Sequence, residues 1–573
     1  MPPGRVYQSE HARRTAEPAP AAEAAAAAAG APPDEHGNAA GNSAIMALGS
    51  LVSRITGFLR TVIIAAALGS TLVGNAYTTA QWFPGMVYEL LLGGILTSVL
   101  VPSLVRARKF DPDRGEAYTQ RLVTLAVLAL GATTVLAVAC APILVWISRT
   151  EAPGLVRAWS YLILPTIFFY GLAGVLMAVL NTRGHFAAPM WAPILNNLVV
   201  IATFALYLLI YGAEVLDPAE MDAGRILLIG GGTLLGIVVQ AAGLLPALRR
   251  VGFRMRWRFD FKALRLGELA RLGGWMFCYV GANQIGVLVV LSLINGANAE
   301  AGLLIFNQVF LLLMMAHGIV GVSIIMALMP RMSGAAADKR YDDLVTDVTT
   351  GARMATAVLA PIAVAYVVLA QPISTTLFQW GVFNASAADA TAPVLLMAGL
   401  ALIPFSVGQL ATFAHYALSD TKTPALVNIG TVIVRISVQL GIFAAFAASF
   451  VAAGMMLGNA VSYVFAAVVM ATLLHRRLGS LRLRQVGVSL GKVLLAAIGA
   501  AGAGALVVLL LPGGAQPSKL EALAQLILGG LAVLGAYFGL ARLLRVDELN
   551  EMLVLVGRKI PAIGRLANPR RPQ

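Results

Sequence analysis

The strongest constraint on this sequence is a succession of long apolar runs separated by short polar connections. A helix that crosses a lipid bilayer needs about 20 mostly apolar residues, and fourteen runs in this chain are of about that length. They predict an all-α polytopic membrane protein with about 14 transmembrane helices. The runs cover residues 44–68, 77–104, 122–147, 159–180, 191–211, 226–245, 273–293, 302–329, 354–370, 392–416, 426–446, 450–474, 493–511 and 523–540.

The composition excludes a water-soluble globule. Charged residues make up 12% of the chain and hydrophobic residues 59%, whereas a soluble domain carries about 25% charged residues. The 2 cysteines, Cys140 and Cys278, both lie inside apolar runs, which argues against a disulfide framework or a cysteine-based metal site. The formal charge of +14 therefore belongs to a membrane protein and need not indicate a nucleic-acid partner.

The distribution of basic residues predicts the orientation of the chain, because Lys and Arg concentrate on the cytoplasmic side of a membrane. With the N-terminus inside, the even-numbered connections contain 24 basic residues and the odd-numbered ones contain 4. Both termini are therefore expected to face the cytoplasm of a bacterial inner membrane. Residues 1–42, which contain no apolar run, are predicted to be a disordered, uncleaved cytoplasmic tail, and residues 545–573 a basic one.

Two pairs of similar segments indicate an internal repeat. The sequence GILTSVLVPSLVRA around Pro102 resembles VSIIMALMPRMSGA around Pro330, 228 residues later, and Leu180 corresponds to Leu418 at an offset of 238. Two parallel six-helix lobes are predicted, an arrangement in which transporters place a site between the lobes. The expected parts are an N-terminal lobe at 43–246, a linker at 247–271, a C-terminal lobe at 272–475 and helices 13 and 14 within 476–544.

The linker alternates basic residues with Phe253, Trp257 and Phe259. This pattern favours an amphipathic segment that rests on anionic membrane lipids. A connector that holds two moving lobes is the alternative. RNA binding does not suit a short loop that is tied to the membrane at both ends.

Charged residues inside the apolar runs are the candidate functional residues, because each costs at least about 2.5–3.5 kcal/mol to insert. They are Arg54, Arg60, Glu89 and Arg435. Arg54 and Arg60 are about 600° apart on a helix, so they share a broad face. Two guanidiniums at one cavity suit a phosphate or diphosphate, and salt bridges within the bundle are the alternative.

The remaining polar residues in the runs leave alternatives open. Glu89 either neutralises one of the arginines or takes up a proton, and Arg435 either faces a cavity or extends to the interface. Polar pairs such as Asn307-Gln308 more often join helices than bind ligands. No catalytic or phosphate-loop motif is present, so an enzyme is not expected, and neither is a cofactor.

Three segments carry a resemblance to a known family. They are SRITGFLRTVIIAAALG at 53–69, LNTRGHFAAPMWAPILNN at 180–197 and YALSDTKTPALVNI at 416–429. With the predicted topology, they resemble the MurJ (MviN) family of lipid II flippases, in the superfamily of multidrug, oligosaccharidyl-lipid and polysaccharide exporters. The resemblance covers residues 44–544. It implies a V-shaped cavity for the diphosphate and sugar-peptide headgroup, a tail groove formed with helices 13 and 14, and alternating access driven by an ion gradient or the membrane potential.

The resemblance also implies site residues, with several departures from the family pattern. The family arginines of the first helix match Arg54 and Arg60, but Thr61 and Asn75 stand where acids are expected. Tyr88-Glu89 replaces a basic pair, and the arginine expected in span eight is missing near Asn307 and Gln308. The implied substrate-binding residues are Arg54, Arg60, Glu89, Asn75, Asn307 and Gln308.

The implied function is translocation of lipid II from the inner to the outer leaflet. The implied partners are lipid II or a similar polyprenyl-diphosphate lipid, anionic membrane lipids and cell-wall synthesis proteins, with no nucleic acid. Because the departures leave the cavity less cationic, two alternatives stay open. One is an exporter of another polyprenyl-linked glycan or of a drug, and the other is a non-transporting cell-wall scaffold.

Overall fold

The computed structural model describes residues 39–90, 101–264, 266–297, 302–479, 481–514, 517–546 and 548. Every regular element within them is a helix, and thirteen helices are long and apolar enough to cross a membrane. Each of the thirteen coincides with one predicted run, which confirms the all-α polytopic class. The remaining predicted run, 77–104, contains residues 91–100, which lie outside the described residues.

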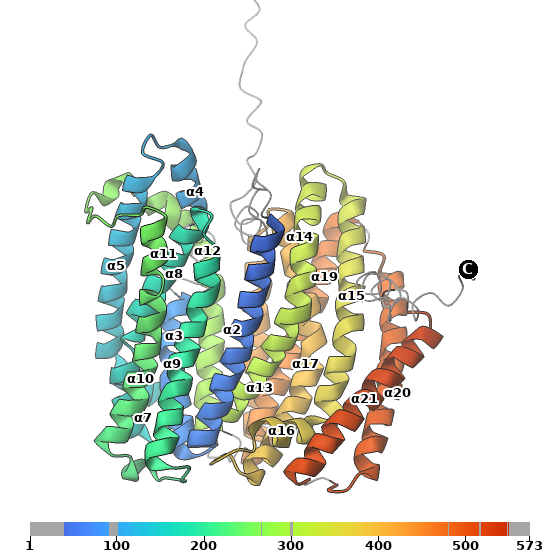
Figure 1. Ribbon diagram of the computed structural model, residues 1–573. Coiled ribbons are helices and arrows are strands. Elements are labelled where there is room, and N and C mark those ends of the chain that lie inside the picture. Colours follow the sequence, from blue (N-terminus) through green and yellow to red (C-terminus); the bar gives the residue numbers. More distant parts are fainter. Residues whose placement is uncertain are drawn as a thin grey trace, which may run out of the picture.

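The helices pack in two groups that follow each other along the chain (Figure 1). The first group contains α2 (Ala39–Leu68), α3 (Leu72–Tyr88), α4 (Val101–Phe110), α5 (Glu116–Ala139), α6 (Ala141–Ile147), α7 (Pro153–Ile163), α8 (Thr166–Thr182), α9 (Ala187–Tyr211), α10 (Ala223–Ala242) and α11 (Leu245–Arg250). The second group contains α12 (Leu266–Asn295), α13 (Leu303–Ala316), the π-helical turn η5 (His317–Gly321), α14 (Val322–Ala337), α15 (Tyr341–Val368), α16 (Ala370–Phe378), α17 (Ala385–Ala417), α18 (Lys422–Ala445) and α19 (Val451–Leu478). The last two helices, α20 (Leu483–Leu510) and α21 (Lys519–Leu543), pair with each other and cover α15 and α16.

The starts of several helices are set by local sequence. Thr71, Asp222 and Asn384 each accept a hydrogen bond from a backbone N–H of the first turn of α3, α10 and α17. Side chains of this kind satisfy donors that a helix leaves unpaired at its N-terminus. Pro165, which lacks an N–H, separates α7 from α8.

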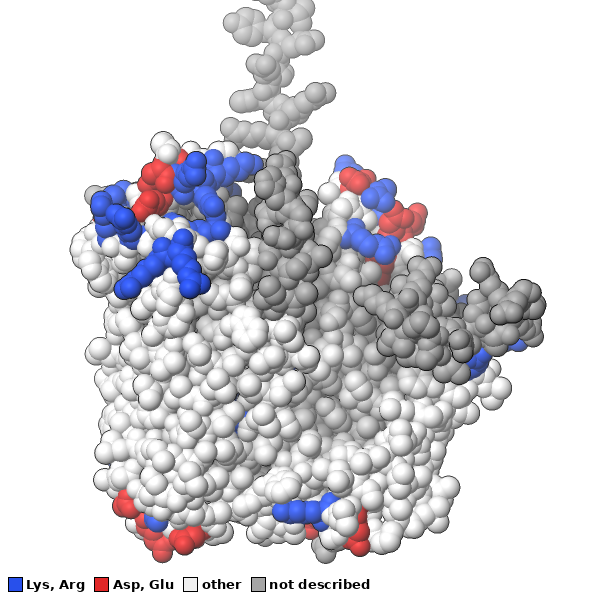
Figure 2. Space-filling model, in the orientation of Figure 1, with Lys and Arg blue, Asp and Glu red and all other residues white. Residues whose placement is uncertain are grey.

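The two ends of the helix bundle differ in charge. Lys and Arg gather at the upper end in Figure 2, over α4 and the connections next to α5, α14 and α15. We call this the basic end, which carries the connections 111–115, 251–260 and 338–340. The other end, which carries 69–71 and 379–384, is called the opposite end.

Among the described residues, the hydrophobic core joins the two groups in the half near the opposite end. There a single cluster includes Tyr77 and Phe204 of the first group together with Leu291, Leu304 and Phe383 of the second. Toward the basic end, the core of the described residues divides into three clusters. One lies within the first group, around Leu122 and Leu180. A second lies within the second group, around Leu328 and Leu344. A third joins α15 to α20 and α21, around Tyr537.

Hydrogen bonds between the groups have the same distribution. Asn295 Nδ2 donates to Thr79 Oγ1 at 3.0 Å and to the Ser148 carbonyl at 3.1 Å. The Leu304 N–H donates to Asn75 Oδ1 at 3.1 Å. The Val382 N–H donates to the Ala66 carbonyl at 2.8 Å. All four of these hydrogen bonds lie at the opposite end, where they join the two groups.

The predicted linker lies on the first group. The Arg258 Nε donates to Gln120 Oε1 of α5 at 2.9 Å, and Arg121 forms an ion pair with Asp260 at 2.6 Å. Hydrogen bonding from Arg121 holds the pKa of the Asp260 carboxyl below its ordinary value. Trp257 and Phe259 are exposed, as an interfacial segment requires.

Candidate functional site

A cavity of about 570 Å³ lies between the two helix groups. The first group contributes α3, the residue after it and α8, and the second contributes α12, α13, α18 and α19. The polar lining residues are Gln81, Glu89, Gln284, Asn307, Arg435 and Asn459. The aromatic lining residues are Trp82, Tyr88, Tyr170, Phe306, Phe310 and Tyr463. A concave site with aromatic walls and few polar groups is typical of ligand-binding pockets.

Arg435 is the cation of this cavity. Its guanidinium lies directly against Gly286 of α12, where a Cβ atom would overlap it. Its Nε and Nη2 atoms are buried and have no hydrogen-bond partner, and no ion pair to it is found within the described residues. Leaving buried charged donors unpaired costs about 1–3 kcal/mol or more, so an anion entering the cavity would be stabilised here.

Glu89 and Asn307 line the same cavity as Arg435. Glu89 is exposed, and among the described residues it pairs with none of the three candidate arginines. With one arginine and one glutamate, the cavity has no net formal charge. The sequence left two interpretations of Glu89. The described residues show no ion pair between Glu89 and an arginine, and proton uptake by Glu89 stays a prediction.

Arg54 does not line the cavity but contacts the second group at an unusual element. The guanidinium of this α2 residue lies against Gly318, where a Cβ atom would overlap it. Gly318 belongs to η5, and π-helical turns inside α-helices frequently mark functional sites. Arg54 is half-buried, and within the described residues it forms no salt bridge.

Arg60 has different neighbours, on the first group. Its Nε atom is buried without a hydrogen-bond partner, and it interacts electrostatically with Tyr77 and Tyr170. Tyr170 lines the cavity, whereas Arg60 does not. Arg54 and Arg60 therefore have neighbours in different helix groups, Arg54 in the second and Arg60 in the first.

Asn75 and Gln308 lie elsewhere. Asn75 joins the two helix groups by accepting from Leu304, and it lines a separate pocket of about 200 Å³ at the opposite end, beside Asn295. Gln308 is 1% exposed, and neither atom of its amide has a hydrogen-bond partner in the described structure. The structure therefore brings Glu89 and Asn307 to the cavity, but not Asn75 or Gln308.

The pair Asn196-Asn197 illustrates how polar residues join helices. Asn197 Nδ2 of α9 donates to the Ser53 carbonyl at 3.2 Å and to Thr56 Oγ1 at 3.1 Å, both on α2. A Cβ atom on Gly57 would lie 3.5 Å from the same nitrogen. This contact fixes the helix that carries Arg54 and Arg60 against the first group.

Sequence comparisons agree on one family. The family model described as lipid II flippase MurJ matches residues 64–515. A probable lipid II flippase MurJ of Synechocystis sp. is 26% identical over 468 residues, covering 79% of this chain and 84% of that protein. Another, from Bdellovibrio bacteriovorus, is 26% identical over 529 residues, covering 89% and 95%.

Solved structures show the same fold. A lipid II flippase MurJ in an inward closed conformation superposes with a TM-score of 0.70 at 16% identity, covering 87% of this chain and 98% of that one. An inward-facing multidrug transporter of the MATE family and MOP superfamily superposes with a TM-score of 0.60 at 15% identity, covering 75% and 95%.

Proposed function

This chain belongs to the MurJ family of lipid II flippases, and we propose that it holds the lipid II headgroup in the cavity between its two helix groups. Its function is to move this lipid-linked peptidoglycan precursor across the bacterial inner membrane, as a multi-pass transporter. The inner-to-outer direction and the residues that contact the headgroup are our proposals.

The observation that carries the proposal is that the buried Nε and Nη2 atoms of Arg435 have no hydrogen-bond partner in a cavity bordered by both helix groups. A diphosphate supplies the acceptors that the buried Nε and Nη2 atoms lack, and charge-assisted hydrogen bonds of this kind are strong. The six aromatic side chains of the cavity offer flat surfaces to the sugars. Asn307 and Glu89 offer hydrogen-bonding partners to the same headgroup.

The two arginines of α2 belong to the same proposal. Arg60, whose charge acts on the cavity residue Tyr170, and Arg54, at the contact between α2 and η5, would attract the diphosphate as it enters between the groups. Neither has a carboxylate partner in the described part of the chain. Their charge is therefore available to a ligand.

Alternating access follows from the way the groups are joined. We assign the basic end to the cytoplasm, which places both termini there. Because the shared core and the four hydrogen bonds described above lie at the opposite end, we infer that this conformation is closed on the outer side. Transport would break these contacts, including that of Asn75, and form new ones at the basic end. We assign the polyprenyl tail to a groove formed with α20 and α21, where Leu509 and Leu531 are exposed.

The test is the Arg435→Gln variant in cells depleted of their own lipid II flippase. We expect loss of growth and accumulation of lipid II in the inner leaflet, with normal amounts of the variant in the membrane. Arg157→Ala, an exposed arginine of α7, is the control and should support growth. A scaffold has no need of a cavity arginine, so full growth of Arg435→Gln would contradict the proposal. Growth failure with normal lipid II distribution would favour an exporter of another glycan.

A further inference from the structure

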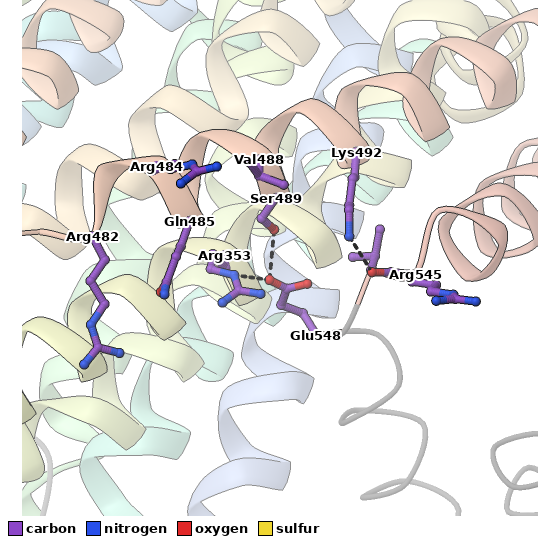
Figure 3. A pocket seen from close by; sticks show the side chains of 10 residues that line it. Arg353, Arg482, Arg484, Gln485, Val488, Ser489, Lys492, Arg545 and Glu548 are labelled. Carbon is purple, nitrogen blue, oxygen red and sulfur yellow. Dashed lines mark hydrogen bonds and ion pairs between the residues drawn. The ribbon is translucent and has the colours of Figure 1, made fainter.

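A second pocket, of about 690 Å³, lies at the basic end between α15, α20 and the residues that follow α21 (Figure 3). We call it the interface pocket. It shares no lining residue with the cavity between the helix groups. Its lining is Arg353, Arg482, Arg484, Gln485, Val488, Ser489, Lys492, Arg545, Val546 and Glu548.

The charge of the interface pocket is strongly positive. Five basic side chains and one carboxylate line it, which leaves a formal charge of +4. The carboxylate, Glu548, is 5% exposed and is already engaged, since it forms an ion pair with Arg353 and accepts from Ser489 Oγ at 2.8 Å. Figure 3 shows these two interactions. Arg484, Lys492 and Arg545 line the same pocket, and Glu548 is the one acid among the described lining residues.

One face of α20 forms the front of the pocket. Arg484, Val488 and Lys492 follow each other at a spacing of four residues, which places them along one side of a helix. Lys492 Nζ donates to the Arg545 carbonyl at 3.0 Å and so holds the residues after α21 against α20. Arg484 and Arg545 are exposed at the rim.

The same face of α20 continues into the membrane as an apolar surface. Val488 in the pocket is 54% exposed, and Leu495 and Ile498, further along the helix, are 59% and 60% exposed. A Cβ atom on Gly491 would meet nothing within 4 Å, so space is left between them. A ligand that fits both parts has an anionic head and an apolar tail.

We propose that the interface pocket binds the phosphate headgroup of an anionic glycerophospholipid of the leaflet at the basic end. Arg484, Lys492 and Arg545 contact the phosphate, and an acyl chain lies over Val488 and Leu495. Clusters of basic residues at a membrane surface attract anionic lipids in this way. Charge complementarity and the adjoining apolar surface favour a lipid over a free anion. The separation from the cavity favours a lipid that stays bound over one that is transported. The bound lipid would fasten α20 and α21 to α15.

Native mass spectrometry of the purified full-length chain tests this proposal. The probes are phosphatidylglycerol, zwitterionic phosphatidylcholine, undecaprenyl phosphate and sodium phosphate. We expect one phosphatidylglycerol to be retained at concentrations where phosphatidylcholine is not. The double variant Arg484→Gln with Lys492→Gln should bind it about 30-fold more weakly, the product of two basic contacts.

A matched control and a second measurement keep the result interpretable. Arg106→Gln with Lys109→Gln removes two exposed basic residues of α4, also at the basic end, and it should retain the lipid. Thermal unfolding should show that phosphatidylglycerol stabilises the original chain and the control but not the pocket variant, whose unliganded melting point reports whether it folds. Equal retention by both variants would overturn the proposal. So would selective retention of undecaprenyl phosphate, or displacement of the lipid by millimolar sodium phosphate.

Discussion

The cavity between the helix groups and the interface pocket differ in the net charge of the residues that line them. The cavity contains one arginine and one glutamate, whereas the interface pocket has a formal charge of +4. A charge in the bilayer interior costs at least about 2.5–3.5 kcal/mol, while one at the interface keeps contact with water and headgroups. Few charges are therefore placed in the interior, and each is held in a defined position.

Glycines supply part of that positioning. The guanidinium of Arg435 lies against Gly286, and that of Arg54 lies against Gly318, on a facing helix in both cases. Any larger side chain at either glycine would occupy the place of the guanidinium. Arg484 and Arg545 at the interface pocket are exposed and have more freedom. Substitutions near the interior arginines should therefore be tolerated less than those in the interface pocket.

The largest expected difference between the regions comes from removing one arginine from each. Arg60→Ala should abolish growth of flippase-depleted cells, because it removes a positive charge of α2 whose buried Nε has no hydrogen-bond partner. Arg484→Ala should weaken lipid retention and reduce growth far less. Growth curves at matched membrane levels of the two variants measure the difference. The comparison fails if Arg484→Ala is as severe as Arg60→Ala.

The next test keeps Arg435 and fills the space that its guanidinium occupies against Gly286. Gly286→Val should displace the Arg435 guanidinium and lower transport about 10- to 100-fold, the range for losing a charged hydrogen bond. Gly441→Val in α18 is the matched control, because a Cβ atom there would meet nothing within 4 Å. Rates of lipid II appearance in the outer leaflet measure both. Equal rates for the two variants would show that Arg435 does not need Gly286.

Gly318→Ala applies the same reasoning to Arg54. Its Cβ atom would overlap the guanidinium, but Arg54 is half-buried and has more room to move than Arg435. We therefore expect a smaller loss of transport, about tenfold, at an unchanged amount of protein. Gly231→Ala in α10, with open space around its added methyl, should retain full transport. An unchanged transport rate for Gly318→Ala would show that transport does not depend on the position of Arg54 against Gly318.

These glycine contacts also show what the sequence could and could not predict. Membrane spans depend on about 20 consecutive residues, and the thirteen that the structure describes match predicted runs. The charge of Arg435 is equally visible in the sequence. Its contact with Gly286, 149 positions earlier, is not, since nothing local distinguishes this glycine from others in apolar runs.

Contacts between residues far apart in the sequence also explain why the positions of several site residues could not be predicted. Asn75 accepts a hydrogen bond from Leu304, 229 positions away, so its position at the opposite end depends on how the groups pack. Adjacent residues Asn307 and Gln308 point to different surroundings because a helix turns by about 100° per residue. Trp82, Tyr170, Phe306 and Tyr463 line the cavity, but aromatic residues in apolar runs usually fill a core or face lipid.

Glu548→Gln tests whether the interface pocket depends on its one carboxylate. The substitution removes the ion pair with Arg353 but keeps an acceptor for Ser489. We expect the free energy of unfolding to fall by about 1–3 kcal/mol, measured by thermal unfolding. Glu214→Gln, an exposed residue of the connection after α9, should have no such effect. Unchanged stability of Glu548→Gln would mean that the pocket is not fixed by this contact.

The smallest expected effect concerns the ion pair between Asp420 and Arg477 at the basic end. Its contribution to the stability of the protein should depend on pH. Asp420 precedes α18, and its carboxylate accepts from the Thr423 N–H and hydroxyl and pairs with Arg477 at 2.6 Å. Burial alone would raise the pKa of Asp420, but these hydrogen bonds and the positive charge lower it. The carboxylate therefore stabilises the fold above its unfolded pKa of about 4, and this contribution is lost as pH falls through the lower folded pKa.

Asp420→Asn keeps a cap for α18 but removes the charge, so it should lower the stability by about 1 kcal/mol or less at neutral pH. The difference from the original chain should shrink below about pH 4, where the aspartate also becomes neutral. Melting temperatures at several pH values measure this. A difference in melting temperature that stays constant down to the lowest pH would show that the charge on Asp420 is not what stabilises this connection. Arg435 has no carboxylate partner among the described residues. Its contribution to stability should therefore not change with pH in this acidic range.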